Sequence, residues 1–112
     1  MYSKIVYNNQ KVFLFVKSDI DTKYTVYGIQ RSGNKYYFYL SDEAADFHLP
    51  ENGSDLKRYV ENNCNIGSSD GPFTSITFLM KSAKKSGAIA EEHASECSKL
   101  CVLAKKHLIE ID

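Results

Sequence analysis

The sequence predicts an α+β fold: an antiparallel sheet of about five strands, a long C-terminal helix packed on the sheet and one short helix. Short runs of β-branched and aromatic residues, separated by turn residues, occupy roughly the first forty positions and indicate strands. Apolar residues spaced three and four apart near the C-terminus indicate an amphipathic helix. The chain has 112 residues, so we expect a single domain spanning residues 1–112.

The first two strands are predicted on either side of a turn. Ile5–Tyr7 carries a β-branched pair and an aromatic residue, and Asn8–Gln10 is a turn signal. Lys11–Lys17 encloses five consecutive apolar residues between two lysines. An apolar run this short is typical of a strand covered on both faces.

A β-hairpin is predicted next. Tyr24–Gln30 and Lys35–Leu40 flank Arg31–Asn34, where Gly and Asn tolerate a positive φ. In the second strand, one face would carry Tyr36, Phe38 and Leu40, and the other Tyr37 and Tyr39. Since both faces are aromatic, this strand is either central in the sheet or meets a partner with its outer face.

The middle of the chain is predicted to be mixed. Phe47–Leu49 could form a short strand, and Ser54 is a favourable N-cap for a short helix over Asp55–Glu61. The composition of Asn62–Phe73 indicates a loop. We expect the last strand at Thr74–Met80, with Ile76, Phe78 and Met80 facing inward.

The long helix is predicted from about Ala88 to Ile109. Acidic residues lie in its first turns and basic residues in its last, which suits the helix dipole. Its apolar stripe consists of Ala90, Ala94, Cys97, Cys101, Ala104 and Leu108.

The charge and hydropathy of the chain exclude several classes of function. Fourteen basic residues balance fourteen acidic ones, so no overall positive charge favours direct binding of nucleic acid or of an anionic membrane. The longest apolar runs have five residues, against about 20 needed to span a bilayer. Three cysteines, an odd number, fit a reducing compartment. With no signal-peptide pattern at the start, we expect a soluble, cytoplasmic protein without a membrane segment.

One group of residues has the side chains of a possible metal site. His93, Cys97 and Cys101 are four apart along the predicted helix, and Cys64 or His48 could complete a tetrahedral zinc site. The same helix face is the apolar one, which favours core packing instead. We therefore expect no metal site and no cofactor.

The cysteines and histidines are the candidate catalytic residues of the sequence. Cys64 lies beside a glycine-containing loop and could be a reactive thiol, but no base is identifiable near it in the sequence. His48 and His107 could form an acid–base pair of the kind that cleaves RNA, and His107 also suits a helix C-terminus. Since no motif of defined chemistry is present, we expect no catalytic residues and a protein that is not an enzyme.

The distribution of charge is more informative than its total. Residues 42–61 hold six acids and two bases, and residues 1–35 hold six bases and two acids. An acidic segment next to tyrosines is suited to a basic protein partner, because tyrosine is enriched at interfaces and complementary charge speeds association. The predicted partner-binding residues are Tyr37, Tyr39, Asp42, Glu43, Asp46, Glu51 and Asp55.

The segment Lys35–Glu43, followed by a predicted short helix in a small, tyrosine-rich chain, resembles immunity proteins of polymorphic and contact-dependent growth-inhibition toxin systems. The resemblance implies a role as a non-enzymatic inhibitor. The partner would be a cognate toxin domain, usually a nuclease, and binding would need no cofactor.

Two other interpretations stay open at this point. Consecutive strands followed by a C-terminal helix loosely match a pleckstrin-homology-like module that binds lipid or protein, with a basic pocket at Lys11, Lys17, Arg31 and Lys35. The second of these interpretations is a small enzyme whose catalytic residues are Cys64 or the histidines. The sequence leaves the oligomeric state open.

Overall fold

The structure, a computed structural model, describes residues 2–17, 19, 23–44, 67–70 and 73–109. These residues form a five-stranded sheet in the order β1-β2-β3-β4-β5, in which every neighbouring pair is antiparallel. The strands are β1 (Tyr2–Asn8), β2 (Lys11–Lys17), β3 (Lys23–Ser32), β4 (Lys35–Ala44) and β5 (Gly67–Asp70). They are followed by α2 (Phe73–Lys85), the short 3₁₀ helix η1 (Glu91–His93) and α3 (Ala94–Ile109).

The α+β class and the antiparallel sheet are confirmed. The four long strands β1–β4 correspond to the four predicted strands of residues 5–40 and form successive hairpins. Two tight turns join them where the sequence predicts turns: Asn9 adopts a φ of 50° between β1 and β2, and Gly33 a φ of 63° between β3 and β4. β5 has only four residues and pairs with Lys35–Phe38 of β4.

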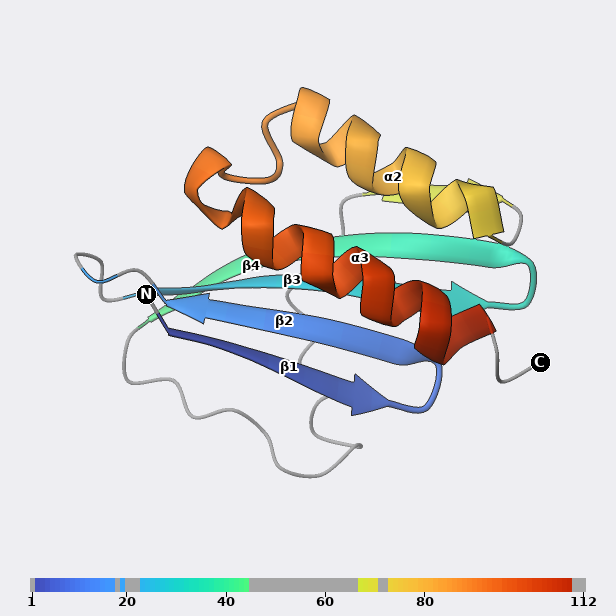
Figure 1. The fold of residues 1–112 in the computed structure, drawn as a ribbon, viewed down its shortest axis with the longest axis horizontal. Coiled ribbons are helices and arrows are strands. Elements are labelled where there is room, and N and C mark those ends of the chain that lie inside the picture. The colour runs from blue at the N-terminus through green and yellow to red at the C-terminus, as the bar shows by residue number, and fades with distance from the viewer. Residues whose placement is uncertain (1, 18, 20–22, 45–66, 71–72, 110–112) are drawn as a thin grey trace.

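Both helices lie over the same face of the sheet (Figure 1). α3 runs across β2 and β3, and α2 lies beside it over β4 and β5. The sheet contributes alternate residues of β2, β3 and β4 to this core, and the helices contribute one stripe each, as alternation and helical periodicity require. The largest fully buried members are Val12, Leu14, Tyr27, Ile29, Tyr36, Phe38, Ile76, Leu100 and Leu108.

The opposite face of the sheet has a smaller cluster of its own. Phe13, Phe15 and Val26 are fully buried there, and Tyr24 and Tyr39 pack against them. Thus the prediction that Lys11–Lys17 is covered on both faces is confirmed for Val12–Val16.

The strand predicted at Thr74–Met80 is wrong, because these residues lie within α2. Phe78, which was expected to face inward, has 66% of its surface exposed, while Ile76, Leu79, Met80 and Ala83 are buried. That spacing of three, four and seven is helical, and it extends past Met80, where the alternating pattern stops. The predicted loop Asn62–Phe73 is wrong in part, because it contains β5 and the first residue of α2.

The two helices are separated by a glycine-terminated turn. Gly87 has a φ of 80° and donates its N–H to Lys84 O at 3.2 Å, and Ala88 N–H donates to Ala83 O at 2.9 Å. These two bonds form a Schellman motif, whose left-handed residue is most easily glycine. The C-terminal helix is confirmed, but its first turns differ from the prediction: α3 begins at Ala94, after the 3₁₀ turn.

Two predicted elements, the short strand Phe47–Leu49 and the short helix Asp55–Glu61, lie outside the described residues. In the part of the chain that the structure describes, neither helix is both long and apolar enough to cross a lipid bilayer.

Candidate functional site

The predicted partner-binding residues fall into two groups. Tyr37 and Tyr39 lie on β4, and the backbones of Asp42 and Glu43 continue the same strand, opposite Thr25 and Tyr24 of β3. Asp46, Glu51 and Asp55 lie outside the described residues. The end of β4 therefore places the two tyrosines and the first two acids on one strand.

Tyr37 and Tyr39 lie on the face of the sheet opposite the helices. Both are half-buried, and their rings are stacked with centroids 6.4 Å apart and an angle of 30° between the planes. Tyr39 Oη donates a hydrogen bond to Gln30 Oε1 at 2.5 Å, so its ring is fixed by β3. By contrast, Tyr36 and Phe38 are buried in the core beneath the helices.

A third tyrosine, Tyr24, is half-buried on the same face as Tyr39. Lys17 Nζ lies 5.6 Å from the centre of the Tyr24 ring, within the range of a cation–π interaction. Tyr24 is opposite Glu43 in the register of β3 and β4. This end of the hairpin thus combines an aromatic ring with a cationic side chain, next to the backbone of Glu43.

The four basic residues of the alternative pocket are not brought together as one site. Lys11 and Lys17 are at opposite ends of β2, about 20 Å apart at ~3.3 Å per residue. Lys11 is buried, whereas Lys35 is exposed. Arg31 donates to Leu108 O at the C-terminal end of α3 and to Gly33 O, both at 3.0 Å. These two bonds give Arg31 a structural role at the end of α3.

The residues considered for zinc are core residues instead. Cys97 is buried, and Cys101 is half-buried against the same core. Burial raises the pKa of Cys97 to about 12, with a smaller contribution from Glu96, and burial also raises the pKa of Cys101. Among the described residues, no three His, Cys, Asp or Glu side chains are grouped as metal ligands would be. Cys64 and His48 lie outside the described residues.

His107 lies in the last turn of α3, as predicted. Its Nε2–H donates to Asn9 O at 3.0 Å, and its ring is tilted against Tyr7 with centroids 4.5 Å apart. These contacts fix the end of α3 to the first turn of the sheet. They leave His107 in a structural role.

A buried polar pair was missed by the sequence analysis. Tyr27 Oη accepts a hydrogen bond from Ala90 N–H at 3.2 Å and lies 2.8 Å from His93 Nδ1. The hydroxyl thus joins the backbone before η1 to the His93 ring, and the direction of the bond to Nδ1 depends on the histidine tautomer. Nε2 is buried without a hydrogen-bond partner, with Glu92 Oε1 at 3.6 Å. Tyr27 and His93 are 66 positions apart, and no spacing rule connects them.

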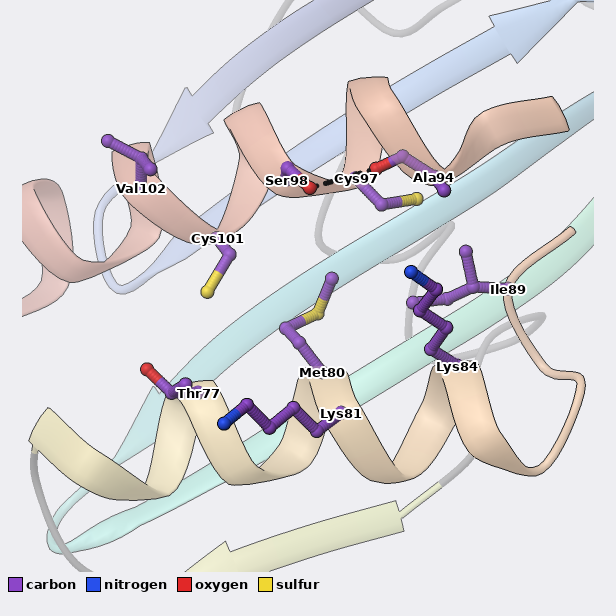
Figure 2. Close-up of a pocket in the computed structure, with 10 residues that line it drawn as sticks. All are labelled: Thr77, Met80, Lys81, Lys84, Ile89, Ala94, Cys97, Ser98, Cys101 and Val102. Carbon is purple, nitrogen blue, oxygen red and sulfur yellow. Dashed lines mark hydrogen bonds between the residues drawn. The ribbon is translucent and has the colours of Figure 1, made fainter. Parts of the chain in front are cut away.

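A groove between α2 and α3 was also missed, because residues of α2 were predicted to be a strand. Its volume is about 290 Å³ (Figure 2). Met80, Ile89, Cys97 and Cys101 supply apolar surface, and Lys81 and Lys84 lie on its α2 side. The remaining lining residues are Thr77, Ala94, Ser98 and Val102.

Comparison with protein-family models, with curated proteins and with solved structures finds no match to this chain.

Proposed function

We propose that the protein is a small, non-enzymatic inhibitor of the immunity type, which binds and neutralises a cognate toxin domain. The partner we propose is a basic nuclease domain. Its contacts would be Tyr37, Tyr39 and the acidic residues of the segment that begins at Asp42. This proposal rests on the charge and tyrosine pattern of the sequence and on the placement of the tyrosines.

The stacked pair Tyr37 and Tyr39 is the observation that carries the proposal. A half-buried tyrosine fixed by its neighbours loses little conformational entropy when a partner covers it, so it is an efficient contact residue. Tyr39 is fixed in this way by its hydrogen bond to Gln30 and by its stacking on Tyr37. The strand that carries both residues continues directly into Asp42 and Glu43.

Acidic residues that follow Tyr37 and Tyr39 along the strand would raise the rate of association with a basic partner. A nuclease groove is positive because it binds phosphates, and an acidic surface is steered toward it. An interface of roughly 1,200–2,000 Å² would be sufficient for a stable complex.

The direct test is inhibition of the toxin domain encoded beside the gene. The purified protein should block its nuclease activity at a one-to-one ratio, and co-expression should protect cells. Tyr37→Ala combined with Tyr39→Ala should raise the dissociation rate at least tenfold, whereas Tyr2→Ala combined with Tyr7→Ala should leave it unchanged. If no neighbouring gene encodes a toxic domain, or if the two proteins do not form a complex, the proposal is wrong.

The contribution of Asp42 and Glu43 to the association rate is tested separately, with a matched control. Asp42→Lys combined with Glu43→Lys should slow association and weaken its dependence on salt. The same charge change at two exposed acids of η1, Glu91→Lys and Glu92→Lys, should have a smaller effect. Equal effects of both variants would show that only the net charge matters.

A further inference from the structure

The groove between α2 and α3 is independent of the proposed toxin-binding surface. It opens between the two helices (Figure 2), and these cover the face of the sheet opposite the one that carries Tyr37 and Tyr39. Phe78, the most exposed apolar side chain of α2, does not line the groove, whereas Val102, an exposed apolar side chain of α3, does. The groove is therefore a separate feature of the helical layer.

Its floor is apolar. Met80, Ile89 and Cys97 are buried at its base, and Cys101 projects into the space between the helices in Figure 2. Because burial raises the pKa of both thiols, both are neutral at pH 7 and add apolar surface. The Ser98 hydroxyl already donates to Ala94 O at 3.0 Å, so it is not available as a donor for a ligand. A strongly polar molecule would find few partners on this floor.

Its rim is cationic. Lys81 and Lys84 are exposed on adjacent turns of α2, and no described residue that lines the groove is acidic. Such a site favours a ligand with one anionic end and an apolar remainder. The volume of about 290 Å³ equals that of roughly ten water molecules at ~30 Å³ each, and a methylene group is of similar size.

We propose that this groove binds a medium-chain fatty acid as its carboxylate, with the alkyl chain on Met80, Ile89 and Cys97 and the carboxylate beside Lys81 and Lys84. Burial of the chain supplies the affinity, and the two lysines select the anion over a neutral or cationic chain of the same length.

Calorimetric titration with decanoate, below the concentration at which it forms micelles, tests the proposal. We expect saturable one-to-one binding, with decyltrimethylammonium bound at least tenfold more weakly. Lys81→Ala combined with Lys84→Ala should weaken decanoate binding roughly three- to tenfold. The matched control is Lys85→Ala combined with Lys106→Ala, which removes the same charge from two exposed lysines that do not line the groove.

A second pair of variants tests the position of the ligand. Ser98→Glu places a negative charge in the lining and should weaken binding at least as much as the loss of both lysines. Ser82→Glu places it on an exposed residue of α2 outside the lining and should have no effect. In a Cys64→Ser background, saturating decanoate should also slow the alkylation of Cys101 by iodoacetamide at least threefold.

Four results would overturn the proposal. They are the absence of saturable binding, equal binding of the cationic amphiphile, equal weakening by the control variants, and an alkylation rate of Cys101 that decanoate does not change. An acidic helical peptide that binds more tightly and displaces decanoate would show that the groove is a peptide site instead.

Discussion

The ring of Phe13 lies directly over Gly28, its partner in the β2–β3 register. A Cβ atom on Gly28 would be 2.5 Å from Phe13 Cδ1 and 2.7 Å from Cε1, closer than such atoms can approach. Tyr39 occupies the next strand opposite Gly28, with its Cβ 3.6 Å from the same point. The missing side chain at position 28 is thus what allows two aromatic residues to lie on either side of β3.

Gly28→Ala should destabilise the protein by about 1–3 kcal/mol, because the Phe13 ring must move from a fully packed position. Urea denaturation measures the loss. In a cycle with Phe13→Leu, which shortens the side chain above the glycine, the double variant should be more stable than the sum of the single effects predicts, by at least about 0.5 kcal/mol. Strict additivity would show that the ring contact is not the cause.

Tyr27→Phe should cost about 1–3 kcal/mol, because it removes the hydroxyl that satisfies both His93 Nδ1 and the Ala90 N–H in a buried place. The loss should be accompanied by faster amide exchange at Ala90, at the start of the 3₁₀ turn. Tyr7→Phe is the control, since Tyr7 is 45% exposed, and it should change the free energy of unfolding by less than about 0.5 kcal/mol. A Tyr27→Phe variant as stable as the parent would contradict the assigned hydrogen bonds.

The stability contributed by Glu96 should depend on pH. Hydrogen bonds from Ser3 Oγ at 2.8 Å and Lys99 Nζ at 3.1 Å lower the pKa of Glu96 from its ordinary value of 4.5. A carboxyl group whose pKa is lowered by folding stabilises the protein above its unfolded pKa, and this contribution disappears as the pH falls through the lowered pKa.

Glu96→Gln should therefore reduce stability at pH 7 by a few tenths to about 1 kcal/mol, as expected for hydrogen bonds and an ion pair near the surface, and the difference from the parent should shrink below about pH 4. Denaturation at several pH values measures it, and Glu91→Gln serves as the control on the exposed 3₁₀ turn. If the difference in free energy of unfolding between the parent and Glu96→Gln grew as the pH fell, the assigned lowering of the Glu96 pKa would be contradicted.

Cys97 should be almost inert in the folded protein. With a pKa of about 12, only about one thiol in ten thousand is ionised at pH 8, and its side chain is buried. In a Cys64→Ser background, iodoacetamide should alkylate Cys101 more slowly than free cysteine, and Cys97 more slowly still, as mass spectrometry of digested samples can measure. In denaturant, both cysteines should react at the rate of free cysteine. Equal rates for the two cysteines in the folded state would contradict the arrangement of α3.

The strands were predictable because their signals are local. The apolar run Val12–Val16 and the Gly33–Asn34 turn each determine structure within a few residues, and both predictions are confirmed. Thr74–Met80 failed because β-branched and aromatic residues favour strands, while the helical burial of Ile76, Leu79 and Ala83 depends on contacts with distant strands. Leu100, which the predicted stripe omitted, is fully buried, and its position three residues after Cys97 and four before Ala104 fits the helical spacing.

Site geometry was less accessible to sequence reasoning. The alternation along β4 correctly separated Tyr36 and Phe38 from Tyr37 and Tyr39, but it did not show which pair would face the helices. The pair of Tyr27 and His93 joins residues from opposite ends of the chain, and the groove exists only because α2 and α3 lie side by side. Such features arise from the packing of elements, which periodicity does not encode.

The order of elements along the chain has a consequence for synthesis on the ribosome. Each of β2, β3 and β4 bonds to the strand made just before it, so the meander can form while translation continues. The apolar side of that meander stays uncovered until Leu100, Ala104 and Leu108 have been made, some seconds later at roughly 5–20 residues per second. During that interval the nascent chain exposes Val12 and Leu14 to other molecules, which makes it a natural client for chaperones.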